Sequence, residues 1–132
     1  MQNIRVILWG LGAMGSGMAK DLLLNKKGVE IVGAIGSNPA KIGKDLGESL
    51  GLGRNLGIFI SDNPAAVLKT PADIVLLSTS SFTKEVLPQL KLIAEAGKNI
   101  VTIAEQMAAP QAQSPDLAEE IDQIARKNGV TI

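Results

Sequence analysis

The feature that most constrains this chain is an apolar stretch, Ile4–Trp9, that runs directly into the pattern Gly-x-Gly-x-x-Gly. The three glycines are Gly10, Gly12 and Gly15, and the residues after them, 16–24, have helical character. A strand, a glycine-rich turn and a helix in this order are typical of a site for the phosphates of a dinucleotide. Gly10 would make the tight turn, Gly12 would let the backbone approach a pyrophosphate, and Gly15 would let the helix pack close to the sheet.

The turn and the start of the helix supply the first candidate ligand residues. A helix N-terminus has free N–H groups and a dipole that favours negative charge. We therefore expect five residues here to bind a cofactor: Gly10, Gly12, Ala13, Met14 and Gly15. A glycine-rich turn without a ligand is the alternative, but three ordered glycines would then raise the entropy cost of folding without an evident packing reason.

The composition narrows the classes of function. The 132 residues suit one domain, and 13 basic residues balance 13 acidic ones, so no basic field is expected to attract nucleic acid or a membrane surface. The sequence has no cysteine, which excludes disulfides and cysteine-ligated metal and is consistent with a cytoplasmic protein. It also lacks histidine and tyrosine, the usual groups for proton transfer at neutral pH. We expect no metal site and no catalysis by this chain alone.

Strands and helices alternate along the rest of the chain. We expect strands at 4–9, 30–35, 58–60, 73–77 and 99–103, with a sixth beginning at 130–132. Helices are expected at 13–24 and 39–50, from Pro64, from the end of loop 78–81 to Ala96, and from Pro115 to Gly129. This alternation predicts an α/β fold, a doubly wound parallel sheet of the Rossmann type, with its ligand crevice at the carboxyl ends of the strands.

The end of the second expected strand bears on the choice of cofactor. Sites that prefer NAD usually place Asp or Glu there to bind the ribose 2′-hydroxyl, and this chain has Gly36. Ser37 and Asn38 could donate hydrogen bonds to a 2′-phosphate, and Lys41, one turn into the next expected helix, could supply positive charge. We therefore favour NADP over NAD. Use of both cofactors stays open, and Ser37 to Pro39 could instead be only a turn and helix cap.

Two later loops add weaker candidates. Ser78, Thr79 and Ser80 follow the fourth expected strand and would lie near the nicotinamide ribose, although the same residues could simply cap the next helix. Ala104 and Glu105 follow the fifth strand at the same edge of the sheet. Ala104 is a cofactor candidate. Glu105 is a weak catalytic candidate, because a polar loop residue without a catalytic role explains it as well.

Longer segments of the chain are similar to known families. Residues 10–23 by themselves resemble the nucleotide signature of the β-hydroxyacid dehydrogenases. Residues 32–35, 38–48 and 94–101 instead resemble the N-terminal domain of the dihydrodipicolinate reductase-like group. Within that group, residues 77–82 and 102–110 are similar to the members that act on short diamino acids. The resemblance extends over essentially the whole chain, with Gly36 where an acid is common and Ala109 where an aromatic residue is expected.

The resemblance implies an activity and a further domain. The implied parent reaction is NAD(P)-dependent oxidative deamination of 2,4-diaminopentanoate or a similar short diamino acid, or its reverse. Proteins of this kind continue into a second domain that holds most substrate contacts and closes a homo-oligomer, so we expect residues 1–132 to be the dinucleotide-binding domain alone. A stand-alone, non-catalytic dinucleotide-binding module is one alternative. Another is a fragment of dihydrodipicolinate reductase or of a β-hydroxyacid dehydrogenase, although the latter predicts a glycine-rich motif that residues 104–113 lack.

Overall fold

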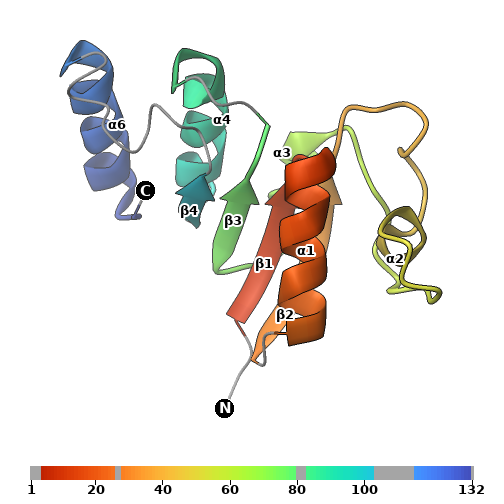
Figure 1. Ribbon diagram of the computed structural model, residues 1–132. Helices are drawn as coiled ribbons and strands as arrows, with labels where there is room; N and C mark the ends of the chain where they lie inside the picture. Colours follow the sequence, from red (N-terminus) through yellow and green to blue (C-terminus); the bar gives the residue numbers. More distant parts are fainter. Residues whose placement is uncertain (1–3, 26–27, 80–82, 103–114, 132) are drawn as a thin grey trace.

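The computed structural model describes residues 4–25, 28–79, 83–102 and 115–131. These residues form a sheet of four parallel strands in the order β2-β1-β3-β4 (Figure 1). The strands are β1 (Ile4–Trp9), β2 (Val29–Ile35), β3 (Ile74–Leu77) and β4 (Asn99–Thr102). The predicted parallel α/β sheet is confirmed, and each of these strands lies within one residue of its predicted start and end.

Helices cover both faces of the sheet. They are α1 (Ala13–Asn25), α2 (Leu46–Ser49), α3 (Pro64–Val67), α4 (Thr83–Glu95) and α6 (Pro115–Asn128). Figure 1 shows α1 in front of β1 and β2, with α4 and α6 beyond β3 and β4. Helices α4 and α6 are followed by Gly97 and Gly129, which adopt positive φ angles of 76° and 66° and so end them, as predicted.

The central strands pack on both faces, and their alternate side chains belong to two different core clusters. One core cluster joins Ile7 and Val75 of the sheet to Leu90 and Ile93 of α4 and Ile121 of α6. The opposite cluster packs a second set of residues around α1 and α2: Val6, Leu8, Ala19, Ile31 and Leu46. This arrangement explains the near-continuous apolar runs of the central strands.

The strand order reverses between β1 and β3, next to the glycine turn. The chain leaves β1 for β2 on one side and later returns to place β3 on the other. At the end of β1, the Gly10 N–H donates to Ile35 O at 2.9 Å and the Ser78 N–H donates to Trp9 O at 2.8 Å. The turn therefore begins where the carboxyl ends of three strands meet, which is where doubly wound sheets bind ligands.

The expected helix at residues 39–50 is wrong in extent. Residues 39–44 form turns, and only α2 is helical, with Asp45 as its N-cap. The physical reasons lie at two positions. The Asn38 side chain accepts from the Ala40 N–H at 3.0 Å, which favours a turn, and Gly43 has a φ of +84°, which a right-handed helix does not allow.

The expected strands at 58–60 and 130–132 are also not formed as strands in the described residues. Segment 58–60 instead lies beside the loop before α2, and Ser61 makes a single parallel bridge with Ile35 at the outer side of β2. Val130 and Thr131 lie outside any strand, although Thr131 O accepts from the Ile100 N–H at 2.8 Å. Ser61 and Thr131 thus add isolated contacts at the edges of the sheet rather than a ladder.

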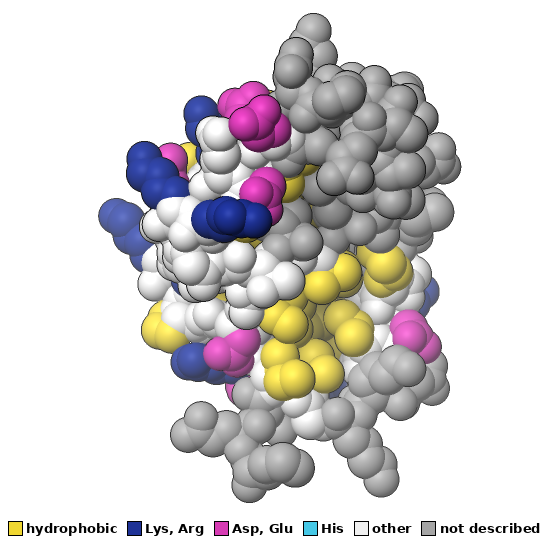
Figure 2. Space-filling view, turned by 90° about the vertical axis from the view of Figure 1, so that its left-hand side faces the viewer, with side chains coloured by type: hydrophobic (Ala, Val, Ile, Leu, Met, Phe, Trp, Pro, Cys, Tyr) yellow, Lys and Arg dark blue, Asp and Glu magenta, His cyan; other side chains and the backbone are white. Residues whose placement is uncertain are grey.

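Some apolar surface stays open to solvent. Val101 of β4 is 51 % exposed and Leu92 of α4 is 44 % exposed. Figure 2, which views the molecule from the α6 side, shows hydrophobic side chains gathered in a hollow below a group of charged ones. Across the described part of the chain, no helix is long and apolar enough to cross a membrane.

Candidate functional site

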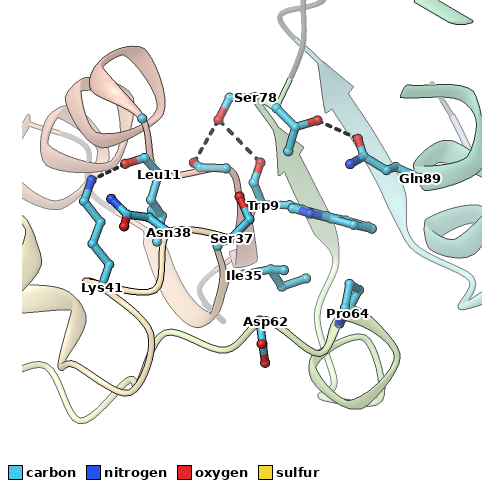
Figure 3. Close-up of a pocket in the computed structure, with 14 residues that line it drawn as sticks. Trp9, Leu11, Ile35, Ser37, Asn38, Lys41, Asp62, Pro64, Ser78 and Gln89 are labelled. Atoms are coloured by element: carbon cyan, nitrogen blue, oxygen red, sulfur yellow. Dashed lines mark hydrogen bonds between the residues drawn. The ribbon is translucent and has the colours of Figure 1, made fainter. Parts of the chain in front are cut away.

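A cavity of about 420 Å³ opens at the carboxyl ends of β1, β2 and β3 (Figure 3). Its walls come from the glycine turn, the turn after β2, the segment before α3, the end of β3 and α4. The lining residues are Trp9, Gly10, Leu11, Gly12, Ile35, Gly36, Ser37, Asn38, Lys41, Asp62, Pro64, Ser78, Thr79 and Gln89. The cavity therefore lies at the crevice that the sequence predicts.

Gly10 and Gly15 are glycines because the chain is crowded at both positions. Gly10 has a φ of +107°, and a Cβ there would lie 2.7 Å from the backbone of Ser78. A Cβ on Gly15 would overlap Gly10 O and lie 2.5 Å from Ser78 Oγ. The Ser78 hydroxyl donates to Gly10 O at 3.0 Å, so β1, α1 and the end of β3 meet within this small space.

Gly12 differs from Gly10 and Gly15 because it faces open space. A Cβ on Gly12 would meet nothing within 4 Å, and its φ is not in the left-handed region. Neither packing nor backbone strain inside the chain therefore explains a glycine here. A ligand backbone approaching this position does explain it, and the first N–H groups of α1, which have no acceptor within the helix, lie beside it. The turn thus fits the pyrophosphate of a dinucleotide.

The turn after β2 brings polar groups and one positive charge to the cavity. Ser37 and Asn38 are exposed. The side-chain oxygen of Asn38 accepts a hydrogen bond from the Ala40 N–H, and its side-chain nitrogen takes no part in that bond. Lys41 lies in the turn rather than on a helix, and its Nζ donates to Leu11 O at 2.7 Å. This bond holds the ammonium group against the glycine turn, as Figure 3 shows.

Most of the predicted site residues are brought together. Eight of them line the cavity: Gly10, Gly12, Gly36, Ser37, Asn38, Lys41, Ser78 and Thr79. Gly15 lies behind the turn, and the backbones of Ala13 and Met14 form the first residues of α1. Ser80, Ala104 and Glu105 lie outside the described residues.

Sequence reasoning missed six lining residues: Trp9, Leu11, Ile35, Asp62, Pro64 and Gln89. Trp9 and Ile35 end their expected strands, so their places at the crevice follow from the sequence, but only the residues after them were named as candidates. Pro64 was expected only as the start of a helix, and no site role was predicted for Asp62 beside it. Gln89 lies inside α4, where nothing in the helical pattern marks a residue that faces a cavity.

A parallel sheet with an open glycine turn at its switch point defines a dinucleotide-binding domain of the Rossmann type. The family model described as dihydrodipicolinate reductase, N-terminus, matches residues 4–130. The chain therefore belongs to this family. Membership makes a nicotinamide dinucleotide, NAD or NADP, the class of cofactor for the site.

Individual relatives agree with this assignment. The chain is 43% identical to 2,4-diaminopentanoate dehydrogenase from Acetoanaerobium sticklandii, over 100% of the chain and 37% of the relative. It is 33% identical to 4-hydroxy-tetrahydrodipicolinate reductase from Methanococcus aeolicus, over 96% of the chain and 45% of the relative. It matches the structure of amine dehydrogenase from Mycobacterium smegmatis with a TM-score of 0.91 and 45% identity, over 98% of the chain and 38% of that protein. The chain thus spans less than half the length of each relative.

Proposed function

We propose that this chain is the NAD(P)-binding part of an amino-acid dehydrogenase. The parent reaction is oxidative deamination of 2,4-diaminopentanoate or a similar short diamino acid, or the reverse reductive amination. The single observation that carries the proposal is the glycine turn, in which Gly10 and Gly15 are crowded while Gly12 faces open space. Contacts within the chain account for Gly10 and Gly15, and the close approach of a ligand accounts for Gly12.

The nature of the substrate rests on the relatives. Two of them, the diaminopentanoate dehydrogenase and the amine dehydrogenase, carry names that describe oxidation at a carbon bearing nitrogen, and the chain is 43% and 45% identical to them. When bound, a nicotinamide would supply the hydride acceptor for such a reaction, in which water replaces the amine as ammonia leaves. The residues of this chain bind and orient the cofactor.

The groups that contact the substrate belong, in this proposal, to a second domain that the relatives' greater length accommodates. That domain would also close a homo-oligomer. The 132-residue chain should then produce no reduced cofactor from 2,4-diaminopentanoate and NAD(P), as followed by the absorbance of the reduced nicotinamide. Steady turnover by this chain would contradict the assignment of the substrate groups to another domain.

The turn after β2 favours NADP. Gly36 places no carboxylate where it would repel a 2′-phosphate, and Ser37, Asn38 and Lys41 supply donors on the same side of the cavity. Asp62 is the one acidic residue among the lining residues, and Figure 3 shows its carboxylate turned away from these three. A phosphate would therefore meet donors here.

Substitution at Gly36 tests the proposal. Gly36→Asp should reverse the preference from NADP to NAD, because a carboxylate accepts the ribose hydroxyls and repels a phosphate. One charge-assisted hydrogen bond contributes about 1.5–3 kcal/mol, so the ratio of the two dissociation constants should change roughly tenfold or more. Calorimetric titration of both cofactors into both proteins measures this ratio.

A neutral variant of the same shape controls for packing. A Cβ on Gly36 would lie 3.2 Å from Ile60 Cγ2, so any side chain here presses on Ile60. Gly36→Asn should suffer the same pressure and keep the NADP preference. The cofactor proposal is wrong if the parent chain prefers NAD and neither substitution changes the ratio. The whole function is wrong if neither cofactor binds.

A further inference from the structure

One wall of the cavity is formed by a pair of polar side chains from different elements. Thr79 follows β3, and Gln89 lies two turns into α4. The Thr79 hydroxyl donates to Gln89 Oε1 at 2.5 Å, and both residues line the cavity. Figure 3 shows the amide nitrogen of Gln89 turned toward Trp9 and the cavity. The bond to Thr79 thus holds the Gln89 side chain at this wall.

The floor next to this wall is apolar. Trp9 and Ile35 end neighbouring strands, and Pro64 opens α3 beside them. Trp9 is only 6 % exposed and Ile35 1 %, so their positions are set by the core beneath. In Figure 3 the charged group of Lys41 lies on the other side of the cavity from Trp9 and Gln89. An uncharged planar group suits this part, and a phosphate does not.

The planar group that would lie here can be identified from the order of phosphates, ribose and base along a dinucleotide. The phosphates belong at the glycine turn, and the adenosine ribose belongs at the end of β2, beside Ser37 and Asn38. The floor of Trp9, Ile35 and Pro64 is the remaining part of the cavity beyond the end of β2. The group attached to that ribose is the adenine base, so the base would lie on this floor with its edge toward Gln89.

We infer that Gln89, held by Thr79, is a specificity-determining residue that selects adenine over other bases. A glutamine amide matches adenine in a bidentate way, with its oxygen accepting from the N6 amine and its nitrogen donating to N7. Gln89 Oε1 has a second lone pair for N6 after accepting from Thr79, and Nε2 keeps its donors. Hypoxanthine carries a carbonyl oxygen in place of the amine and would set two acceptors against each other. The inference rests on the proposed function, because it needs a dinucleotide in the cavity. It places Thr79 beside the adenine rather than near the nicotinamide ribose, where it was expected from the sequence.

The test compares NAD with its hypoxanthine analogue, nicotinamide hypoxanthine dinucleotide. The parent chain should bind NAD about tenfold more tightly than the analogue, the order expected for a good bidentate contact. Gln89→Leu should weaken NAD about tenfold and leave the analogue almost unchanged, so that the two affinities converge. Thr79→Val should narrow the difference in the same direction, because Gln89 then loses the hydrogen bond that holds its side chain at this wall. Titration followed by the fluorescence of Trp9, the one tryptophan of the chain, measures all of these affinities.

Gln123→Leu provides the matched control. Gln123 is exposed on α6 and does not line this cavity, so the same change there should alter neither affinity. The inference is overturned if Gln89→Leu weakens both dinucleotides by the same factor or weakens neither, while the parent chain still binds NAD. If the parent chain binds neither dinucleotide, the proposed function fails as well, so the two failures are distinguishable.

Discussion

The glycine turn at residues 10–15 and the loop at residues 45–57 both direct backbone N–H groups toward a place for negative charge, but only the second supplies that charge itself. In the second loop, the carboxylate of Asp45 accepts from the N–H groups of Gly47, Leu56 and Gly57, each at 2.8 Å. At the glycine turn, the first N–H groups of α1 have no acceptor within the helix, and the space beside Gly12 is open.

The comparison separates stability from binding. The N–H groups around Asp45 are satisfied within the chain, so that loop should contribute to stability with or without a ligand. The N–H groups at the start of α1 gain a charged partner only from outside, so Gly12 should matter for binding and hardly for folding. Gly15 lies in the same turn but is crowded, so it should behave like the structural loop.

The largest expected effect is therefore on folding and comes from Gly15→Ala. The new methyl group would overlap Gly10 O and press on Ser78 Oγ, and the backbone contact cannot easily give way. We expect a loss of about 3 kcal/mol or more in the free energy of unfolding, measured by urea denaturation.

Gly17→Ala is the control, because Gly17 lies on the same helix and a Cβ there would meet nothing within 4 Å. Alanine at this position should stabilise the chain by about 0.5–1 kcal/mol, since glycine is costly inside a helix. Equal effects of the two substitutions would contradict the account of the crowded turn.

A smaller effect on stability should come from Asp45→Asn. The amide keeps the size of the side chain but sets an NH₂ group against one of the three backbone N–H donors. We expect the melting temperature to fall by on the order of 5 °C. Asp122→Asn should change it far less, because the ion pair of Asp122 with Arg126 is exposed on α6.

The same loop predicts a pH dependence. Hydrogen bonds from the backbone, first that of Leu56, hold the pKa of Asp45 below its ordinary value. A lowered folded-state pKa contributes stability that is present above the unfolded pKa of 3.8 and is lost as pH falls through the folded value. The difference in stability between the parent chain and Asp45→Asn should shrink on acidification through this range. The pKa of Asp73 is also lowered, first by the hydrogen bond from the Arg5 N–H. Asp73 is present in both proteins, so its contribution cancels in the difference between them. A constant difference down to low pH would exclude a role for the Asp45 charge.

The sequence predicted the parallel strands well because their signals are local. Short aliphatic runs mark β1, β2, β3 and β4 whatever surrounds them, and glycines border β1 and β2. The helix expected at 39–50 is not formed in full for two reasons. Gly43 has a positive φ angle, which a right-handed helix does not allow, and Asp45 is held by hydrogen bonds from residues far along the chain. Such partners, eleven and twelve residues away, leave no periodic mark in a sequence.

The residues of the site also divide into those with a local signal in the sequence and those whose position depends on packing. The three glycines could be assigned because each has a role set by the turn itself. Lys41 lines the cavity although the helix expected to carry it is not formed, since its position follows from the end of β2. Gln89 could not be found, because its approach to Thr79 depends on how α4 packs against the sheet.

The central claim is that the backbone at Gly12 receives the pyrophosphate of a dinucleotide, and Gly12→Val tests it most directly. The valine side chain would fill the open space beside the turn and exclude the ligand without touching the core. Calorimetric titration with NADP and NAD should detect binding to the parent chain and to a Gly17→Val control, and none to Gly12→Val, while the melting temperatures of Gly12→Val and the control stay alike. Equal affinities of the parent chain and Gly12→Val would contradict the account.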